Sequence, residues 1–163
     1  DAIAQVQNDF DVVLIDSPPE LDLLTLIGMA AATSIIVPMT PSMLDVSSTA
    51  QFMRLVSTYI RVLNQYGADV DYDHFRFLIT RDEPTDGPSQ QMVAFLRALF
   101  PNILMQATCY KSTAVSDATM LKQTIYELER SDITRSTYDR ARNSMDAVGI
   151  EIRKMMEATW GRE

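Results

Sequence analysis

The sequence predicts an α/β fold in which a parallel sheet is flanked by helices. Short apolar runs, at residues 12–15 and within 33–39, lack polar alternation, which is typical of strands buried on both faces of a parallel sheet. Longer segments with apolar residues three and four positions apart lie between these runs, and this spacing indicates amphipathic helices. Strands that alternate with helices imply right-handed crossovers and therefore a parallel sheet.

The individual elements follow from the same patterns and their boundaries. Four segments are expected to be strands, the last of them a strand or an extended segment: residues 10–16, 33–39, 75–80 and 103–110. Six segments are expected to be helices: residues 1–9, 20–32, 43–66, 89–100, 115–128 and 133–160. Gly67 follows the long helix as its C-terminal cap. Four strands are few for this class, and the first residue is Asp1, so we expect an N-terminal portion to be missing.

Composition limits the class of protein. The 163 residues carry 47% hydrophobic and 22% charged side chains, which predicts one soluble globular domain over residues 1–163. The net charge of −8 makes a dedicated sequence-specific DNA binder a poor interpretation. A single cysteine excludes an internal disulfide and indicates a reducing compartment, and one histidine with one cysteine cannot build a zinc site of the His/Cys type. No run reaches the roughly 18 apolar residues of a membrane span.

Asp16 stands where the first predicted strand ends. The run FDVVLIDSPP delivers this carboxylate into a turn stiffened by two prolines, Pro18 and Pro19. In open α/β sheets, ligands bind outside the carboxyl ends of the strands, so this position suits metal or phosphate chemistry. The alternative is that Asp16 only caps the next helix or begins the turn.

The tips of two later strands carry polar and aromatic side chains. Thr80 and Arg81 end the third strand, and the fourth runs into Tyr110 and Lys111. In a parallel sheet these tips lie on the same edge as Asp16, where an aromatic ring, cations and a hydroxyl could hold a base and ribose. The simpler interpretation is that Arg81 pairs with one of the acidic residues that follow it.

Several motifs of nucleotide and hydrolase chemistry are absent. The chain has no GxxxxGK[ST] phosphate loop, no GxGxxG and no GxSxG. The last helix mixes acidic and basic residues, which is usual for a solvated face. A DNA-contacting face is the sharper hypothesis for this helix.

Four stretches resemble one family. Residues 11–46 (DVVLIDSPPELDLLTLIGMAAATSIIVPMTPSMLDV) resemble the second half of the deviant-Walker ATPases of the ParA/MinD type, whose fold is P-loop NTPase-like. Within that family the chain is most similar to the plasmid-partition RepA subgroup, which is encoded with RepB and RepC. Later stretches carry the same resemblance in the same order: FLITRDEPTDGPSQQMVAFLRALF, KSTAVSDATMLKQTIYELER and TYDRA.

The resemblance implies roles for particular residues. It implies ATP and Mg²⁺ as cofactors, with Asp16 as the catalytic, Mg²⁺-linked carboxylate and Pro18 as part of the γ-phosphate switch. It also implies contacts with the base from four residues at the strand tips: Thr80, Arg81, Tyr110 and Lys111. Lys122 and Arg135 are candidates for contact with nucleoid DNA, although no motif specifies them.

The same resemblance implies an assembly and a location. Its members form homodimers in the cytoplasm, associate with the nucleoid through non-specific DNA binding, and work with a ParB- or RepB-like partition protein. The family's Walker A loop and its two lysines are absent from this chain. We therefore expect the chain as given neither to hydrolyse ATP nor to bind it tightly, while the full-length protein would do both. The alternative is a non-enzymatic interaction or regulatory module that retains the fold, from a truncated or degenerate ParA-like gene.

Overall fold

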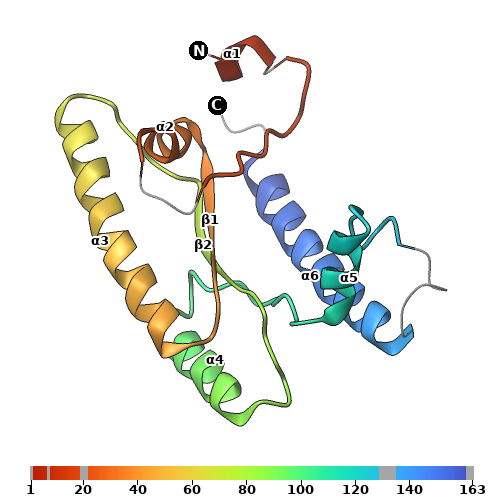
Figure 1. Ribbon diagram of the computed structural model, residues 1–163. Helices are drawn as coiled ribbons and strands as arrows, with labels where there is room; N and C mark the ends of the chain where they lie inside the picture. The colour runs from red at the N-terminus through yellow and green to blue at the C-terminus, as the bar shows by residue number, and fades with distance from the viewer. Residues whose placement is uncertain (1, 7, 19–21, 129–134, 161–163) are drawn as a thin grey trace. The chain divides into compact units, whose positions relative to one another are not determined.

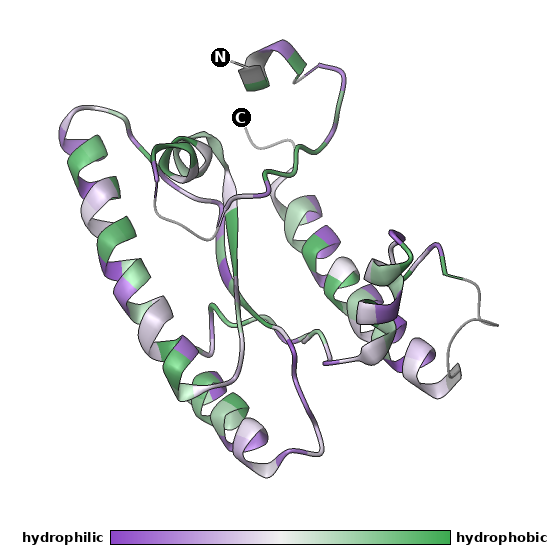
Figure 2. Cartoon of the chain, viewed as in Figure 1, coloured by the Kyte–Doolittle hydropathy of each residue, from purple (hydrophilic) through white to green (hydrophobic). Residues whose placement is uncertain are grey.

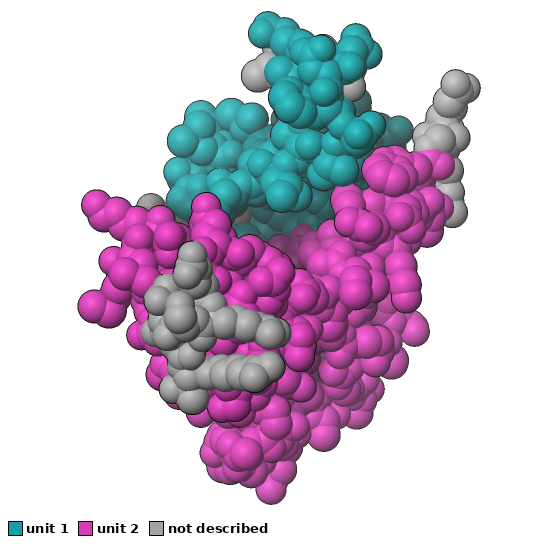
Figure 3. Space-filling model, turned by 90° about the vertical axis from the view of Figure 1, so that its right-hand side faces the viewer, with its two compact units in different colours: residues 1–35, 51–74 teal, residues 36–50, 75–163 magenta. Residues whose placement is uncertain are grey.

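The computed structural model describes residues 2–6, 8–18, 22–128 and 135–160 of the chain (Figure 1). The chain divides into two compact units, residues 1–35 with 51–74 and residues 36–50 with 75–163 (Figure 3). The single-domain organisation over residues 1–163 stays a prediction.

Six helices and two strands make up the described elements, and helices and strands alternate from α2 to α4. They are α1 (Ala2–Val6), α2 (Leu23–Ala31), β1 (Ser34–Met39), α3 (Met43–Gln65), β2 (His74–Ile79), α4 (Gly87–Leu99), α5 (Thr113–Met120) and α6 (Arg135–Thr159). Apolar and polar residues are interspersed along α3, as is expected of an amphipathic helix (Figure 2). None of the described helices is both long and apolar enough to cross a membrane.

The strands β1 and β2 pair side by side in one sheet. At one end the Asp73 N–H donates to the carbonyl of Thr33, and at the other the Thr80 N–H donates to that of Met39. Residue numbers rise together along both strands, so the pair is parallel. The segment after α4 runs beside β2 through two isolated parallel bridges, Phe77 with Leu104 and Asp82 with Tyr110. The predicted α/β class with a parallel sheet and flanking helices is confirmed.

The first predicted strand is wrong for the described residues. Residues 12–18 belong to no strand in the described part of the chain, and Leu14 is 89% exposed. A strand exists only where a neighbour completes its backbone hydrogen bonds, and no described segment does so here. The apolar composition of this stretch therefore does not make it part of the sheet.

The helix predicted at residues 115–128 is also too long. It begins at Thr113 behind the N-cap Ser112, whose hydroxyl accepts from the Ala114 N–H, and it ends at Met120. Lys122 then takes a left-handed backbone conformation with φ 55°, which stops the helix. The long α3 ends as predicted, since Gly67 has φ 83° and the Ala68 N–H returns to the Leu63 carbonyl.

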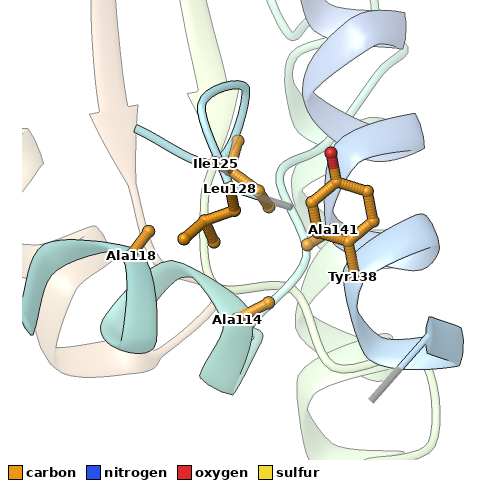
Figure 4. Close-up of a cluster of buried hydrophobic side chains, with 6 residues drawn as sticks. All are labelled: Ala114, Ala118, Ile125, Leu128, Tyr138 and Ala141. Atoms are coloured by element: carbon orange, nitrogen blue, oxygen red, sulfur yellow. The ribbon is translucent and has the colours of Figure 1, made fainter. Parts of the chain in front are cut away.

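A small core joins α5, the turns after it and α6 in the second unit. Its members are small or medium-sized apolar side chains and one aromatic ring, drawn in Figure 4: Ala114, Ala118, Ile125, Leu128, Tyr138 and Ala141. Three of the six are alanines, which let the backbones of α5 and α6 approach closely. This packing lies beside the segment that follows α4, whose Tyr110 N–H donates to the Ser144 hydroxyl of α6.

Candidate functional site

Thr80 and Arg81 follow the end of β2, where Thr80 is hydrogen-bonded to β1 and Arg81 is exposed. The Thr80 backbone N–H donates to the Met39 carbonyl at 2.8 Å, and its hydroxyl donates to the same oxygen at 3.3 Å. Arg81 has φ 54°, a conformation that few residues with a Cβ adopt, and its side chain is exposed. The strand tip therefore turns at Arg81 and presents its guanidinium to solvent.

Tyr110 and Lys111 lie beside this tip. The Asp82 N–H donates to the Cys109 carbonyl at 3.0 Å, and the Lys111 N–H donates to the Asp82 carbonyl at 3.0 Å. The predicted base-contacting residues, Thr80, Arg81, Tyr110 and Lys111, are thus brought together in one unit of the chain. Their role in binding stays a prediction.

Helix α6 supports Tyr110 from the other side. The Ser144 hydroxyl accepts from the Tyr110 N–H at 3.2 Å. The Arg140 guanidinium carbon lies 5.4 Å from the centre of the Tyr110 ring, within the range of a cation–π interaction. Arg140 also donates to the Lys111 carbonyl at 3.4 Å. One face of α6 therefore orients the segment that carries the aromatic ring.

The ion pair at this site is not the one that the sequence suggested. Lys111 Nζ lies 2.8 Å from Glu83 Oε1, and both side chains are largely exposed. Arg81 forms no ion pair with Asp82 or Glu83 within the described residues. The expectation that Arg81 pairs with a neighbouring acid is not met in the described residues, where Glu83 pairs with Lys111 instead.

Asp82 is a buried residue that the sequence analysis missed. Its side chain is 5% exposed, and its carboxylate accepts from Gln90 Nε2 and from Thr108 Oγ1, each at 2.8 Å. An acid shortly after a buried strand was the signal that could have found it, since Asp82 follows the end of β2 by three residues. Beside it, burial raises the pKa of the Cys109 thiol, so this sulfur stays neutral at ordinary pH.

Asp16 lies in the first unit, in the exposed segment before α2. It does not cap that helix. The N-cap is Asp22, whose carboxylate accepts from the Thr25 N–H at 2.8 Å, and this bond lowers the pKa of Asp22. The alternative that Asp16 caps the next helix is therefore wrong, while the alternative that it only begins the turn stays open.

The turn around Asp16 lies against α2. A Cβ placed on Gly28 would come 3.3 Å from Ile15 Cγ2 and 3.7 Å from Ser17 Oγ, so the missing side chain allows this approach. Pro18 follows in the same exposed stretch. That Asp16 shares an edge of the sheet with the strand tips of the other unit stays a prediction.

The two candidate DNA-contacting residues lie in the second unit. Lys122 is exposed at the end of α5, and Arg135 is the first residue of α6, with a side chain outside the described part of the structure. Farther along α6, Arg142 donates to the Tyr138 hydroxyl at 2.7 Å and lies 5.0 Å from the centre of the Tyr126 ring. Local pairs thus engage this part of the helix, as a solvated face of mixed charge predicts.

The donor set suits Mg²⁺ better than a metal held by protein alone. In the described residues, no three His, Cys, Asp or Glu side chains are arranged to hold a metal ion. Mg²⁺ at nucleotide sites commonly uses one or two carboxylates, with phosphates and water completing its octahedron. A single exposed carboxylate such as Asp16 fits that pattern.

The comparisons with known proteins agree with this architecture. Residues 1–66 match the model of a family described as an AAA domain. The fold is similar to that of a solved partition protein, with a TM-score of 0.67 and 17% identity over 94% of this chain and 38% of that chain. This similarity shows a shared fold, an α/β fold with parallel strands and flanking helices.

The sequence relatives carry the resemblance further. The chain is 46% identical over 162 residues to a protein of Sinorhizobium fredii provisionally named replication protein A, covering 99% of this chain. It is 46% identical over 160 residues to a protein of the same name from Rhizobium rhizogenes, and 26% identical over 127 residues to SopA of Escherichia coli K12. The chain spans 40% of the length of the two replication proteins and 32% of SopA. The predicted resemblance to ParA-type partition proteins is confirmed.

Proposed function

We propose that this chain is part of a plasmid-partition ATPase, which segregates replicons through ATP-dependent dimerisation and non-specific DNA binding. The 46% identity to the Sinorhizobium protein over 99% of the chain is the observation that carries the proposal. Identity of this level along the whole chain supports a shared fold and shared site residues. The match covers 40% of the Sinorhizobium protein, so the proposal assigns the remaining parts of a partition ATPase to sequence outside the matched region.

Each site residue has a part in this proposal. Asp16 holds Mg²⁺ together with the phosphates, and Pro18 stiffens the turn that senses the γ-phosphate. The metal, when bound, neutralises charge on the transferred phosphoryl group. The proximity of the β2 tip and the 110–111 segment supports a base site made of a hydroxyl, an aromatic ring and two cations: Thr80, Tyr110, Arg81 and Lys111.

The partners follow from the same resemblance. The protein acts as a homodimer in the cytoplasm and associates with nucleoid DNA, with Lys122 and Arg135 as candidate contacts. A ParB-like partition protein stimulates hydrolysis. Because the chain is acidic overall, its DNA contacts have to be confined to a local basic surface in the neutral stretch after residue 106, where nine basic and nine acidic residues balance.

The chain by itself is a different case. It contains no GxxxxGK[ST] loop, and backbone N–H groups with a lysine around the phosphates are what stabilise the transferred charge. We expect no hydrolysis by the isolated chain and no tight binding of ATP. A titration that gives micromolar affinity for ATP contradicts this expectation.

A chimera tests the enzymatic proposal. The matched 40% of the Sinorhizobium protein is replaced by this chain, and DNA-dependent ATP hydrolysis is measured against the intact relative. The proposal predicts hydrolysis by the chimera and its loss in Asp16→Asn, while Asp9→Asn, an exposed aspartate of the same unit, leaves the rate unchanged. A folded chimera with no hydrolysis, beside an active intact relative, favours the non-enzymatic module instead.

A further inference from the structure

Asp82 joins the two segments of the proposed base site. Its backbone N–H and carbonyl both bond to the 109–111 segment, each at 3.0 Å. Thr80, two residues earlier, bonds instead to Met39 of β1. Between the two, Arg81 takes its left-handed conformation. The chain therefore changes partners across three residues, and Asp82 is where it attaches to the segment that carries Tyr110.

The side chain of Asp82 extends this junction to a third element. Its carboxylate is 5% exposed and accepts at 2.8 Å from Gln90 of α4 and at 2.8 Å from Thr108, just before the Tyr110 segment. Gln90 Nε2 also donates to the Glu83 carbonyl at 3.3 Å. One buried carboxylate thus holds β2, α4 and the 108–111 segment in a single arrangement.

Burying a carboxylate costs free energy of desolvation. The carboxylate of Asp82 loses its hydration, and its side-chain bonds to Gln90 and Thr108 come from a neutral amide and a neutral hydroxyl, neither of which is a cation. An apolar side chain of similar size would fill the space without that cost. Unlike an apolar side chain, the carboxylate fixes the relative positions of Gln90 and Thr108, because each of its two oxygens accepts a hydrogen bond from one of them.

We propose that Asp82 is a positioning residue for nucleoside binding, which acts by holding Arg81, Tyr110 and Lys111 in the geometry that receives a purine base and ribose. The inference rests on the proposed function, because it assumes that these residues contact the base. Asp82 itself does not touch the ligand. Its backbone and its two side-chain acceptor bonds keep the residues that do in place.

Adenosine is the suitable probe, because it carries the base and ribose and needs no phosphate loop. Binding to the 163-residue chain is followed through the backbone amide NMR signals of Tyr110 and Lys111. Asp82→Ala removes both acceptor oxygens, Asp82→Asn retains one, and Thr108→Val removes one donor with little change of shape. Glu157→Gln, an exposed carboxylate of α6 in the same unit, is the control for the change of charge.

The expected loss of adenosine affinity is about tenfold for Asp82→Ala, the size usual when a supporting residue behind a binding group is removed. Asp82→Asn should lose less adenosine affinity than Asp82→Ala. Thr108→Val should weaken binding when Asp82 is present, and the double variant with Asp82→Ala should bind no more weakly than Asp82→Ala alone. Glu157→Gln binds as the native chain does. Circular dichroism at the titration temperature verifies that each variant is folded, and if Asp82→Ala is not, Thr108→Val decides.

Two results overturn the inference, and they can be told apart. If the native chain binds adenosine and the folded Asp82 and Thr108 variants bind within twofold of it, Asp82 does not position the site. If the native chain shows no saturable shift at Tyr110 and Lys111, the base site of the proposed function fails, and the positioning role fails with it.

Discussion

Glu151 fastens the 104–110 segment to α6 through two backbone hydrogen bonds. One carboxylate oxygen accepts from the Gln106 N–H at 2.9 Å, and the other accepts from the Ala107 N–H at 2.7 Å. The residues are 45 and 44 positions apart in sequence, so these bonds hold together distant parts of the chain. Replacing Glu151 by alanine removes both acceptors at once.

The magnitude follows from the exposure of the two N–H groups. A hydrogen bond to a charged acceptor contributes about 1.5–3 kcal/mol when its loss leaves a group unsatisfied. Gln106 is exposed, so water replaces most of its bond, whereas Ala107 is half-buried and loses more. Glu151→Ala should therefore lower the free energy of unfolding by about 2 kcal/mol, and Glu151→Gln, which keeps one oxygen, by about 1 kcal/mol.

Urea denaturation followed by circular dichroism at 222 nm measures both changes. Glu157→Ala, six residues farther along α6 and exposed, controls for the change in helix propensity and charge, and should stay within about 0.5 kcal/mol of the native chain. If Glu151→Ala is no more destabilising than Glu157→Ala, the two bonds do not secure the segment.

Three further predictions concern the backbone, a buried thiol and exposed apolar surface. Gly67→Ala should cost about 1 kcal/mol in unfolding free energy, because φ is 83° there, whereas Gly87→Ala, with open space and no left-handed φ, should cost nothing measurable by urea denaturation. Burial raises the pKa of the Cys109 thiol above its value in the unfolded chain, about 8.5. The stability that the neutral thiol contributes is therefore full below the unfolded pKa and is lost as pH rises through the folded pKa. Cys109→Ala should make the free energy of unfolding decline less steeply with pH over this alkaline range. The isolated chain should bind a hydrophobic dye, because Phe10 and Leu14 are 64% and 89% exposed, and an absence of dye binding contradicts this.

The sequence patterns predicted most elements well where local signals decide them. Gly67 ended α3 as expected, and β1 and β2 formed where apolar runs meet prolines or polar turns. The run at residues 12–15 failed because a strand depends on a neighbour, and the composition of a segment contains no information about that neighbour. The stretch after Met120 failed for a different reason, since a left-handed Lys122 is not foreseen from helix propensity.

The candidate site was predicted in part. The rule that strand tips share an edge correctly brought Thr80 and Arg81 beside Tyr110 and Lys111. The same rule did not predict the burial of Asp82, because burial of an acid depends on hydrogen-bond donors from other elements, here Gln90 and Thr108.

Inheritance of a plasmid tests the central claim most directly. A test plasmid carries the gene of the Sinorhizobium relative with its matched segment replaced by this chain, and the fraction of cells that retain the plasmid without selection is counted over many generations. The intact gene and a deletion of it give the upper and lower references. The account predicts retention near the intact gene and a fall to the deletion level with Asp16→Asn. Retention at the deletion level for the unsubstituted chimera, with the protein folded and present, would contradict a role of this chain in partition.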